Sequence, residues 1–76
     1  MKRLLEALAR ELVSEPSQVS VSERTEPGRV RLALRVARED RGRVIGRGGR
    51  TAEALRTVVD AVARQRGLRC DVEIVD

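Results

Sequence analysis

The stretch GRVIGRGGRT, residues 42–51, combines the residue types that bind phosphate groups in proteins. Three of the chain's six glycines, Gly46, Gly48 and Gly49, fall within four positions, with arginines between and beside them. Glycine lowers the stability of regular structure, so this clustering indicates a turn that other residues cannot make, or another molecule close to the backbone. Backbone N–H groups without side chains over them, next to guanidinium groups, suit phosphate oxygens. We therefore expect an anionic ligand here.

The familiar nucleotide-binding loops do not fit this stretch. A P-loop ending in Gly49-Arg50-Thr51 needs glycine at position 44 and lysine at position 50, where the chain has Val44 and Arg50. The dinucleotide-binding pattern also fails, because Thr51 stands where its third glycine should be. What remains is a Gly-x-x-Gly turn from Gly46 to Gly49. Out of context, the same letters also describe a helix ending at Gly46 and a tight corner at Gly49.

Composition restricts both the class of protein and its partner. The chain has 76 residues, 41% hydrophobic and 37% charged, which indicates one small globular domain, residues 1–76. It has no Phe, Tyr or Trp, which excludes RNA binding of the RRM type, where bases stack on aromatic rings. The single cysteine, Cys70, forms no internal disulfide, and no apolar run is long enough for a signal peptide or membrane span. We expect a cytoplasmic protein with no membrane partner.

Positive charge is concentrated around the glycines. The chain carries a net charge of +4, yet residues 29–50 alone hold eight arginines against two carboxylates, Glu39 and Asp40, for a local charge of +6. The segments on either side each sum to −1. Charge focused in this way favours a polyanionic partner.

Hydrophobic periodicity predicts the element order α-β-β-α-α-β. The clearest signal is residues 29–37, where apolar side chains alternate with arginine and alanine, as in a strand with one buried face. Glu39 and Asp40 suit the start of a short helix, where carboxylates meet the positive end of the helix dipole. The expected elements are helix 2–14, edge strand 17–23, strand 29–37, short helix 39–46, helix 51–66 and strand 68–75.

The connections between these elements predict the fold class. Glu26-Pro27-Gly28 forms a turn that makes the first two strands an antiparallel hairpin. A helical crossover leads from the second strand to the last, so these two should be parallel neighbours. The expected class is α+β, a three-stranded sheet with three helices packed on one face.

Within this frame, the stretch from Val44 to Thr51 resembles the signature of KH (K homology) domains. The element order resembles the type II KH fold, which has its additional helix and strand at the N-terminus. The run AREDRGRVIGRGGRTAEALRTVV and the chain length resemble the bacterial KhpA family of stand-alone KH proteins. The resemblance covers essentially the whole chain and involves no cofactor. It implies binding of single-stranded RNA, an RNA-chaperone or post-transcriptional role linked to cell shape and cell-wall growth, and a homodimer or a complex with a KhpB-like protein.

The resemblance also implies which residues contact RNA. In KH domains single-stranded RNA lies between the two central helices on one side and the last β-strand on the other. The glycine turn clamps the backbone of about four nucleotides. Here the implied contacts are Arg43, Ile45, Gly46, Arg47, Gly48, Gly49, Arg50 and Thr51. Further candidates for RNA contact are Gly42, Arg66 and Arg69. The alternative for Gly42 is a glycine merely tolerated in its helix, and the alternative for Arg66 and Arg69 is charge that only contacts solvent. Family members usually have a polar residue at the position of Gly48, so a third glycine should loosen the turn.

The residues also bear on three rival functions. Catalysis is not expected, because the chain has no histidine, no cluster typical of a triad or metal site, and its Cys70 faces inward on a strand. A protein-interaction module remains the alternative, because the apolar faces of the first and last helices are wider than one small core needs. A DNA-binding helix-turn-helix fits poorly, because the helix before the turn is too short.

Overall fold

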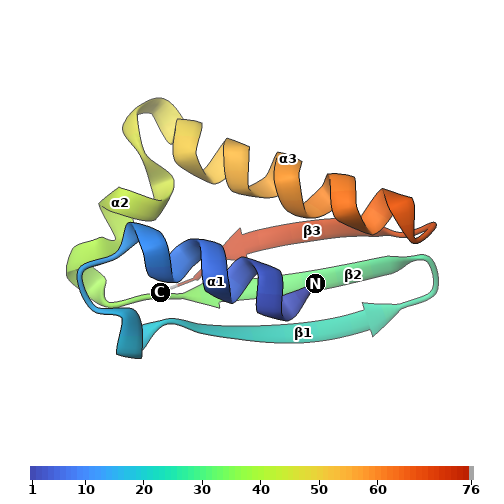
Figure 1. Cartoon of the computed structure of the whole chain (residues 1–76), viewed down its shortest axis with the longest axis horizontal. Helices are drawn as coiled ribbons and strands as arrows, with labels where there is room; N and C mark the ends of the chain where they lie inside the picture. The colour runs from blue at the N-terminus through green and yellow to red at the C-terminus, as the bar shows by residue number, and fades with distance from the viewer. Residues whose placement is uncertain (76) are drawn as a thin grey trace.

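A computed structural model of the chain describes residues 1–75 and confirms the predicted order α-β-β-α-α-β (Figure 1). Short 3₁₀ turns lie at Pro16–Gln18, Arg38–Asp40 and Arg47–Gly49. The helices and strands are α1 (Lys2–Leu12), β1 (Ser20–Glu26), β2 (Arg29–Arg35), α2 (Arg41–Ile45), α3 (Arg50–Gln65) and β3 (Arg69–Ile74).

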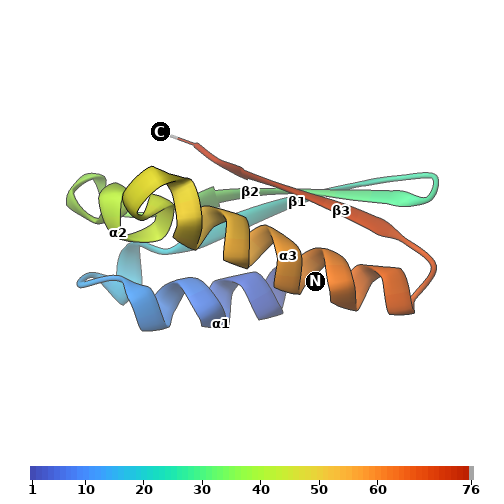
Figure 2. The same ribbon diagram turned by 90° about the horizontal axis from the view of Figure 1, so that it is seen from above.

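The sheet has the order β1-β2-β3, with β2 in the centre. β1 and β2 pair antiparallel, and β2 and β3 pair parallel, as the helical crossover predicted. In Figure 2, α1 and α3 lie side by side against one face of the sheet, and α2 lies at the end where β2 leaves it. This arrangement is the two-layer α+β fold expected from the sequence.

The core lies between the sheet and the helices and is built from aliphatic side chains. Alternate residues of β2 point inward, so Leu32 and Leu34 are buried while Arg31 and Arg35 stand exposed on the outer face. The largest fully buried apolar side chains are Leu5, Leu32, Leu34, Val44 and Val59. Each contributes about 1.5–3 kcal/mol by its removal from water.

β1 differs from its predicted position. It covers Ser20–Glu26 instead of residues 17–23, because Pro16–Gln18 forms a 3₁₀ turn. The half of β1 after Glu23 has no apolar alternation and is mostly exposed, so the sequence pattern could not reveal it. It is a strand because the Pro27-Gly28 turn pairs its last residue, Glu26, with Arg29 and holds the two chains in register.

Asp40 directly precedes α2, at the start of the short helix as the sequence indicated. Its carboxylate makes no capping hydrogen bond to that helix and is fully buried. One carboxylate oxygen accepts hydrogen bonds from the backbone N–H (3.0 Å) and hydroxyl (2.8 Å) of Ser14, and the other accepts from the N–H of Glu15 (3.1 Å). These bonds, led by that from the Ser14 backbone, lower the pKa of Asp40 below its usual value. Asp40 therefore fixes the chain after α1 to the start of α2.

Candidate nucleic-acid interface

The glycines at the end of α2 form a turn that only this backbone permits. α2 ends at Gly46, whose φ is +77° and ψ is 170°, and Gly48 (φ +64°) and Gly49 (φ +79°) follow it. The N–H of Gly46 donates to the carbonyl of Gly42 (2.9 Å), and the N–H of Gly49 donates to the carbonyl of Gly46 (3.1 Å). Three positive φ values within four residues explain the glycines of the sequence. The chain then enters α3 directly.

The three glycines of the turn meet different surroundings. A Cβ at Gly46 would overlap the hydroxyl of Thr51 and lie 2.8 Å from its backbone nitrogen. A Cβ at Gly48 or Gly49 would have nothing within 4 Å. Gly46 is thus required by both its conformation and its packing, whereas Gly48 and Gly49 leave an open surface. That open side is where another molecule can approach the backbone.

Charge at the turn is exposed and largely uncompensated. Arg47 and Arg50 are exposed, and neither forms an ion pair with any residue from 1 to 75. Arg43 is 3.5 Å from the carboxylate of Asp40 through its Nε, yet 61% of its side chain is exposed. The N-terminus of α3, with the positive end of its helix dipole, adds to the attraction for anions.

The residues before the turn divide between core and surface. Val44 is fully buried, whereas Ile45 is 41% exposed and is one of two large apolar side chains that the described chain leaves exposed. Gly42 is exposed, and a Cβ there would meet nothing within 4 Å, so no close packing requires glycine. Arginines on the far side of the sheet behave differently: Arg29 and Arg31 pair with Asp71 and Glu26.

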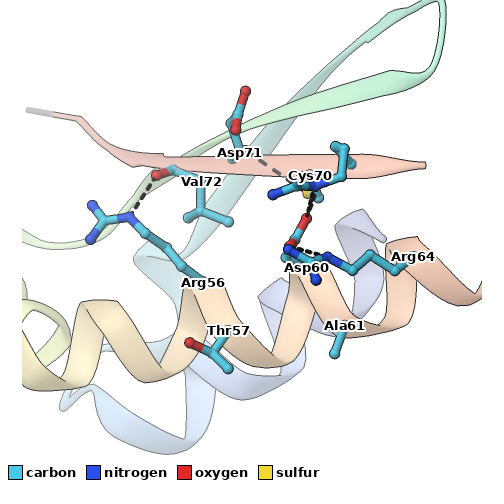
Figure 3. A pocket seen from close by; sticks show the side chains of 9 residues that line it. Arg56, Thr57, Asp60, Ala61, Arg64, Cys70, Asp71 and Val72 are labelled. Carbon is cyan, nitrogen blue, oxygen red and sulfur yellow. Dashed lines mark hydrogen bonds and ion pairs between the residues drawn. The ribbon is translucent and has the colours of Figure 1, made fainter.

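A hollow of about 450 Å³ opens between α3 and β3 (Figure 3). Its wall from α3 carries Arg56, Asp60 and Arg64, and its wall from β3 is formed by residues 69–72. Among the predicted contacts only Arg69 lines it, with its Nε 3.3 Å from Asp60. We call this hollow the α3–β3 cleft.

The predicted residues do not all gather in one place. Residues 42–51 lie together at the start of α3, whereas Arg66 follows its last residue and Arg69 begins β3. α3 has 16 residues, so these two groups are separated by a helix about 24 Å long. A ligand that touches both must run along α3 and past the α3–β3 cleft.

Sequence reasoning did not single out Arg56 and Asp60, which line the cleft. The Nε of Arg56 donates to the carbonyl of Val72 (3.1 Å), and Asp60 accepts from the N–H of Cys70 (2.9 Å). Their spacing of four residues, which puts both on one face of a helix, was the available signal. The Cys70 N–H is the main cause that lowers the pKa of Asp60, helped by Arg69 and Arg64. Burial raises the pKa of the Cys70 thiol, so that it stays protonated.

Other kinds of site find no support in the described chain. Across residues 1–75, no three His, Cys, Asp or Glu side chains are grouped so that they could hold a metal ion. Over the same residues, no helix has the length and apolar character needed to cross a bilayer.

Comparison with known proteins identifies the family of this chain. The family described as KhpA/KhpB, KH domain, matches residues 2–74. Proteins named "RNA-binding protein KhpA" are similar over nearly the whole length. That of Clostridium acetobutylicum is 49% identical over 99% of this chain and 100% of its own. That of Halalkalibacterium halodurans is 43% identical over 100% of both chains, and that of Streptomyces coelicolor is 48% identical over 100% of this chain and 95% of its own. No solved structure gives a significant match.

These matches confirm the resemblance seen in the sequence and the expected fold class. They also confirm that the chain is not an enzyme, because the relatives belong to a non-enzymatic family and are named for RNA binding.

Proposed function

Because this chain belongs to the KhpA/KhpB family of KH-domain proteins, we propose that it binds single-stranded RNA through the turn from Gly46 to Gly49. The observation that carries this proposal is the exposed, unpaired charge of Arg47 and Arg50 on a turn whose glycines leave the backbone open. Three relatives similar over nearly their full length carry the name RNA-binding protein. The chain acts as a single KH domain, residues 1–76.

The turn clamps the RNA backbone through contacts with its phosphates. A phosphate approaches the open side of Gly48 and Gly49 and accepts hydrogen bonds from N–H groups at the start of α3. Arg47 and Arg50 supply mobile positive charge, and Arg43 reaches a further phosphate by leaving its long ion pair with Asp40. The contacts are electrostatic and independent of sequence.

Further contacts complete the groove. Ile45 offers an exposed apolar surface against which a base can lie, next to Gly42 and to the hydroxyl of Thr51. From the turn, the RNA runs along α3 over the α3–β3 cleft, where its bases face β3. It ends beside Arg66 and Arg69. The nucleotides are thus held by the backbone at one end and by base contacts at the other.

Self-association follows from the weakness of one small groove. A site for about four nucleotides binds weakly, and coupling two domains raises the effective affinity. An apolar hollow of about 290 Å³ between α1 and α3 supports a protein contact there, with Val58 at its rim 45% exposed. A homodimer, or a complex with a KhpB-like protein, would bury this surface. In this form the protein serves as a cytoplasmic RNA chaperone or regulator that affects cell shape and cell-wall growth.

The double variant Arg47→Asp/Gly48→Asp tests RNA binding by the turn. Gly48 has a left-handed conformation that aspartate tolerates, with open space for the side chain, so the fold should persist by circular dichroism. Binding of short single-stranded RNAs should weaken at least tenfold in low salt. The slope of log affinity against log salt should fall by about 0.7 for each lost phosphate contact.

A matched control separates this site from general charge. Ser22→Asp/Arg35→Asp changes the net charge by the same amount on the outer face of the sheet, where both side chains are exposed. It should bind RNA nearly as the parent does. Equal loss in both variants would refute a clamp at the turn. A parent that binds no RNA but still binds a protein partner would favour the alternative, an assembly module, for which the apolar hollow is the supporting observation.

A further inference from the structure

β3 is an edge strand, and its open side faces the α3–β3 cleft. The N–H of Arg69 donates to Gly28 (3.0 Å) and that of Val75 donates to Leu34 (2.9 Å), so odd-numbered residues of β3 bond to β2. Because backbone groups in a strand alternate in direction, those of Cys70, Val72 and Ile74 point to the open side. Such groups are available to pair with a ligand unless the protein itself occupies them.

Two side chains of α3 occupy part of this edge. Arg56 donates to the Val72 carbonyl and Asp60 accepts from the Cys70 N–H (Figure 3). Four residues on the helix rise about 6 Å, and two residues on the strand rise about 6.6 Å, so the two spacings match. Both side chains are therefore fixed in position at the cleft rather than free in solvent.

Arg56 and Asp60 differ in what they have left to offer a ligand. Asp60 already accepts from Cys70 and from the Nε atoms of Arg64 (2.9 Å) and Arg69 (3.3 Å). Arg56 uses only its Nε, and within residues 1–75 its terminal nitrogens have no partner. In Figure 3 these nitrogens point toward the N-terminal end of α3, the end that carries the glycine turn. They present a rigid pair of donors to the path proposed for RNA.

We propose that Arg56 is a specificity-determining residue that makes the groove select guanine for the nucleotide entering the α3–β3 cleft. A guanidinium fork pairs with two adjacent acceptors, and on the Hoogsteen edge of a base only guanine offers them, as O6 and N7. On that edge adenine, cytosine and uracil present an amino group or a single acceptor. Cytosine offers adjacent acceptors, O2 and N3, only on its Watson–Crick edge, so equal binding of guanosine and cytidine at this position would overturn the choice of guanine. This inference rests on the proposed binding of single-stranded RNA.

The cleft favours a base over a phosphate at Arg56. Asp60 lines it, and a hydrogen bond from the Cys70 N–H lowers the pKa of this carboxylate, which stays charged at neutral pH. Asp60 pairs with Arg64 and Arg69, whereas Arg47 and Arg50 at the glycine turn form no ion pair within residues 1–75, so a phosphate is attracted more strongly to the turn than to the cleft. The RNA backbone is thus held at the turn, and the base extends toward β3.

The experiment uses uridine octamers that carry one central guanosine, adenosine or cytidine, with binding followed by fluorescence anisotropy at fixed salt. The parent should bind the guanosine octamer at least fivefold tighter than the others, the lower end expected for one bidentate contact. Arg56→Lys keeps the charge but loses the fork, so the preference should fall within twofold while affinity for plain uridine octamer stays. Arg64→Lys, the same change at a residue already paired with Asp60, should keep the preference.

A modified RNA tests the contact without altering the protein. Replacing the central guanosine by 7-deazaguanosine removes the N7 acceptor and should abolish most of the preference in the parent. Absence of a guanosine preference in the parent overturns the inference and leaves RNA binding intact, whereas no binding of any octamer overturns both proposals. A preference that survives both Arg56→Lys and 7-deazaguanosine overturns the assignment to Arg56. Equal weakening of all octamers by Arg56→Lys would mean a phosphate contact and also overturns it.

Discussion

Replacing Gly46 by alanine should damage the protein far more than the same change two residues later. Gly46 has φ +77° and ψ 170°, a conformation that is essentially confined to glycine and costs another residue about 1–3 kcal/mol. The new Cβ would also lie 2.8 Å from the backbone nitrogen of Thr51, closer than real Cβ contacts allow, so the first turn of α3 must shift. We expect Gly46→Ala to lower the free energy of unfolding by about 3 kcal/mol or more.

Gly48→Ala is the matched comparison. Gly48 has φ +64° and ψ 18°, and its Cβ would point into open space. The left-handed conformation costs alanine about 1–2 kcal/mol, and reduced freedom of the unfolded chain returns about 0.4–1 kcal/mol. The net loss should be about 1 kcal/mol. The two variants should therefore differ by about 2 kcal/mol, or roughly 8–16 °C in midpoint temperature for a domain of this size.

Urea denaturation followed by circular dichroism measures both variants against the parent. Adding Thr51→Ala to Gly46→Ala removes the overlapping hydroxyl but leaves the backbone nitrogen in place. Less than half of the lost stability should return. Equal stability of Gly46→Ala and Gly48→Ala, or full recovery in the double variant, would refute the argument that backbone contact makes glycine necessary at position 46.

The remaining predictions concern the fold and the partner surface. Asp40→Asn should destabilise the protein at pH 7, because an amide NH₂ would face the donor N–H of Glu15. The lowered pKa of Asp40 means that its contribution to stability is present above about pH 4 and is lost as pH falls through the folded-state pKa. The stability gap between the parent and Asp40→Asn should therefore be smaller at pH 3 than at pH 7 in urea titrations; an unchanged gap would contradict this. Asp71→Asn, at a carboxylate whose side chain is 47% exposed, should change stability little at either pH. Leu5→Ala should cost about 2–5 kcal/mol in the same titrations, since Leu5 is 0% exposed, and a cost below 1 kcal/mol would show that α1 packs loosely. Val58→Glu should reduce the mass of any self-associated form toward the 8.5 kDa monomer in sedimentation. Thr57→Glu changes a residue that lines the α3–β3 cleft and should leave the mass unchanged. The same mass for both variants would exclude the surface around Val58 as the self-association interface.

Local rules were sufficient wherever one side chain or one turn decides the backbone. The alternation of Val30, Leu32 and Leu34 predicted β2 and its buried face, and the Pro27-Gly28 turn predicted the hairpin. The glycine cluster predicted a turn that needs positive φ, which all three of its glycines adopt. The distribution of charge likewise predicted a concentration of arginines around this turn.

Local rules failed where distant segments decide the outcome. The second half of β1 is a strand only because β2 pairs with it, since its own residues show no apolar alternation. The carboxylate of Asp40 accepts hydrogen bonds from Ser14 and Glu15, which lie 26 and 25 residues earlier in the chain. No sequence pattern near Asp40 could indicate these partners. Its position at the start of a helix indicated only an interaction with the positive end of the helix dipole.

The amino-acid sequence by itself determined the order of elements, the conformation of the glycine turn and the concentration of positive charge around it, because each depends on neighbours within a few residues. The tertiary structure alone decided that Gly46 has no room for a side chain, that Arg43 lies beside a buried carboxylate, and that Arg56 and Asp60 reach the open edge of β3. Those facts depend on how the start of α3 meets the end of α2, and on how the packing of α3 against the sheet aligns one turn of helix with two residues of strand.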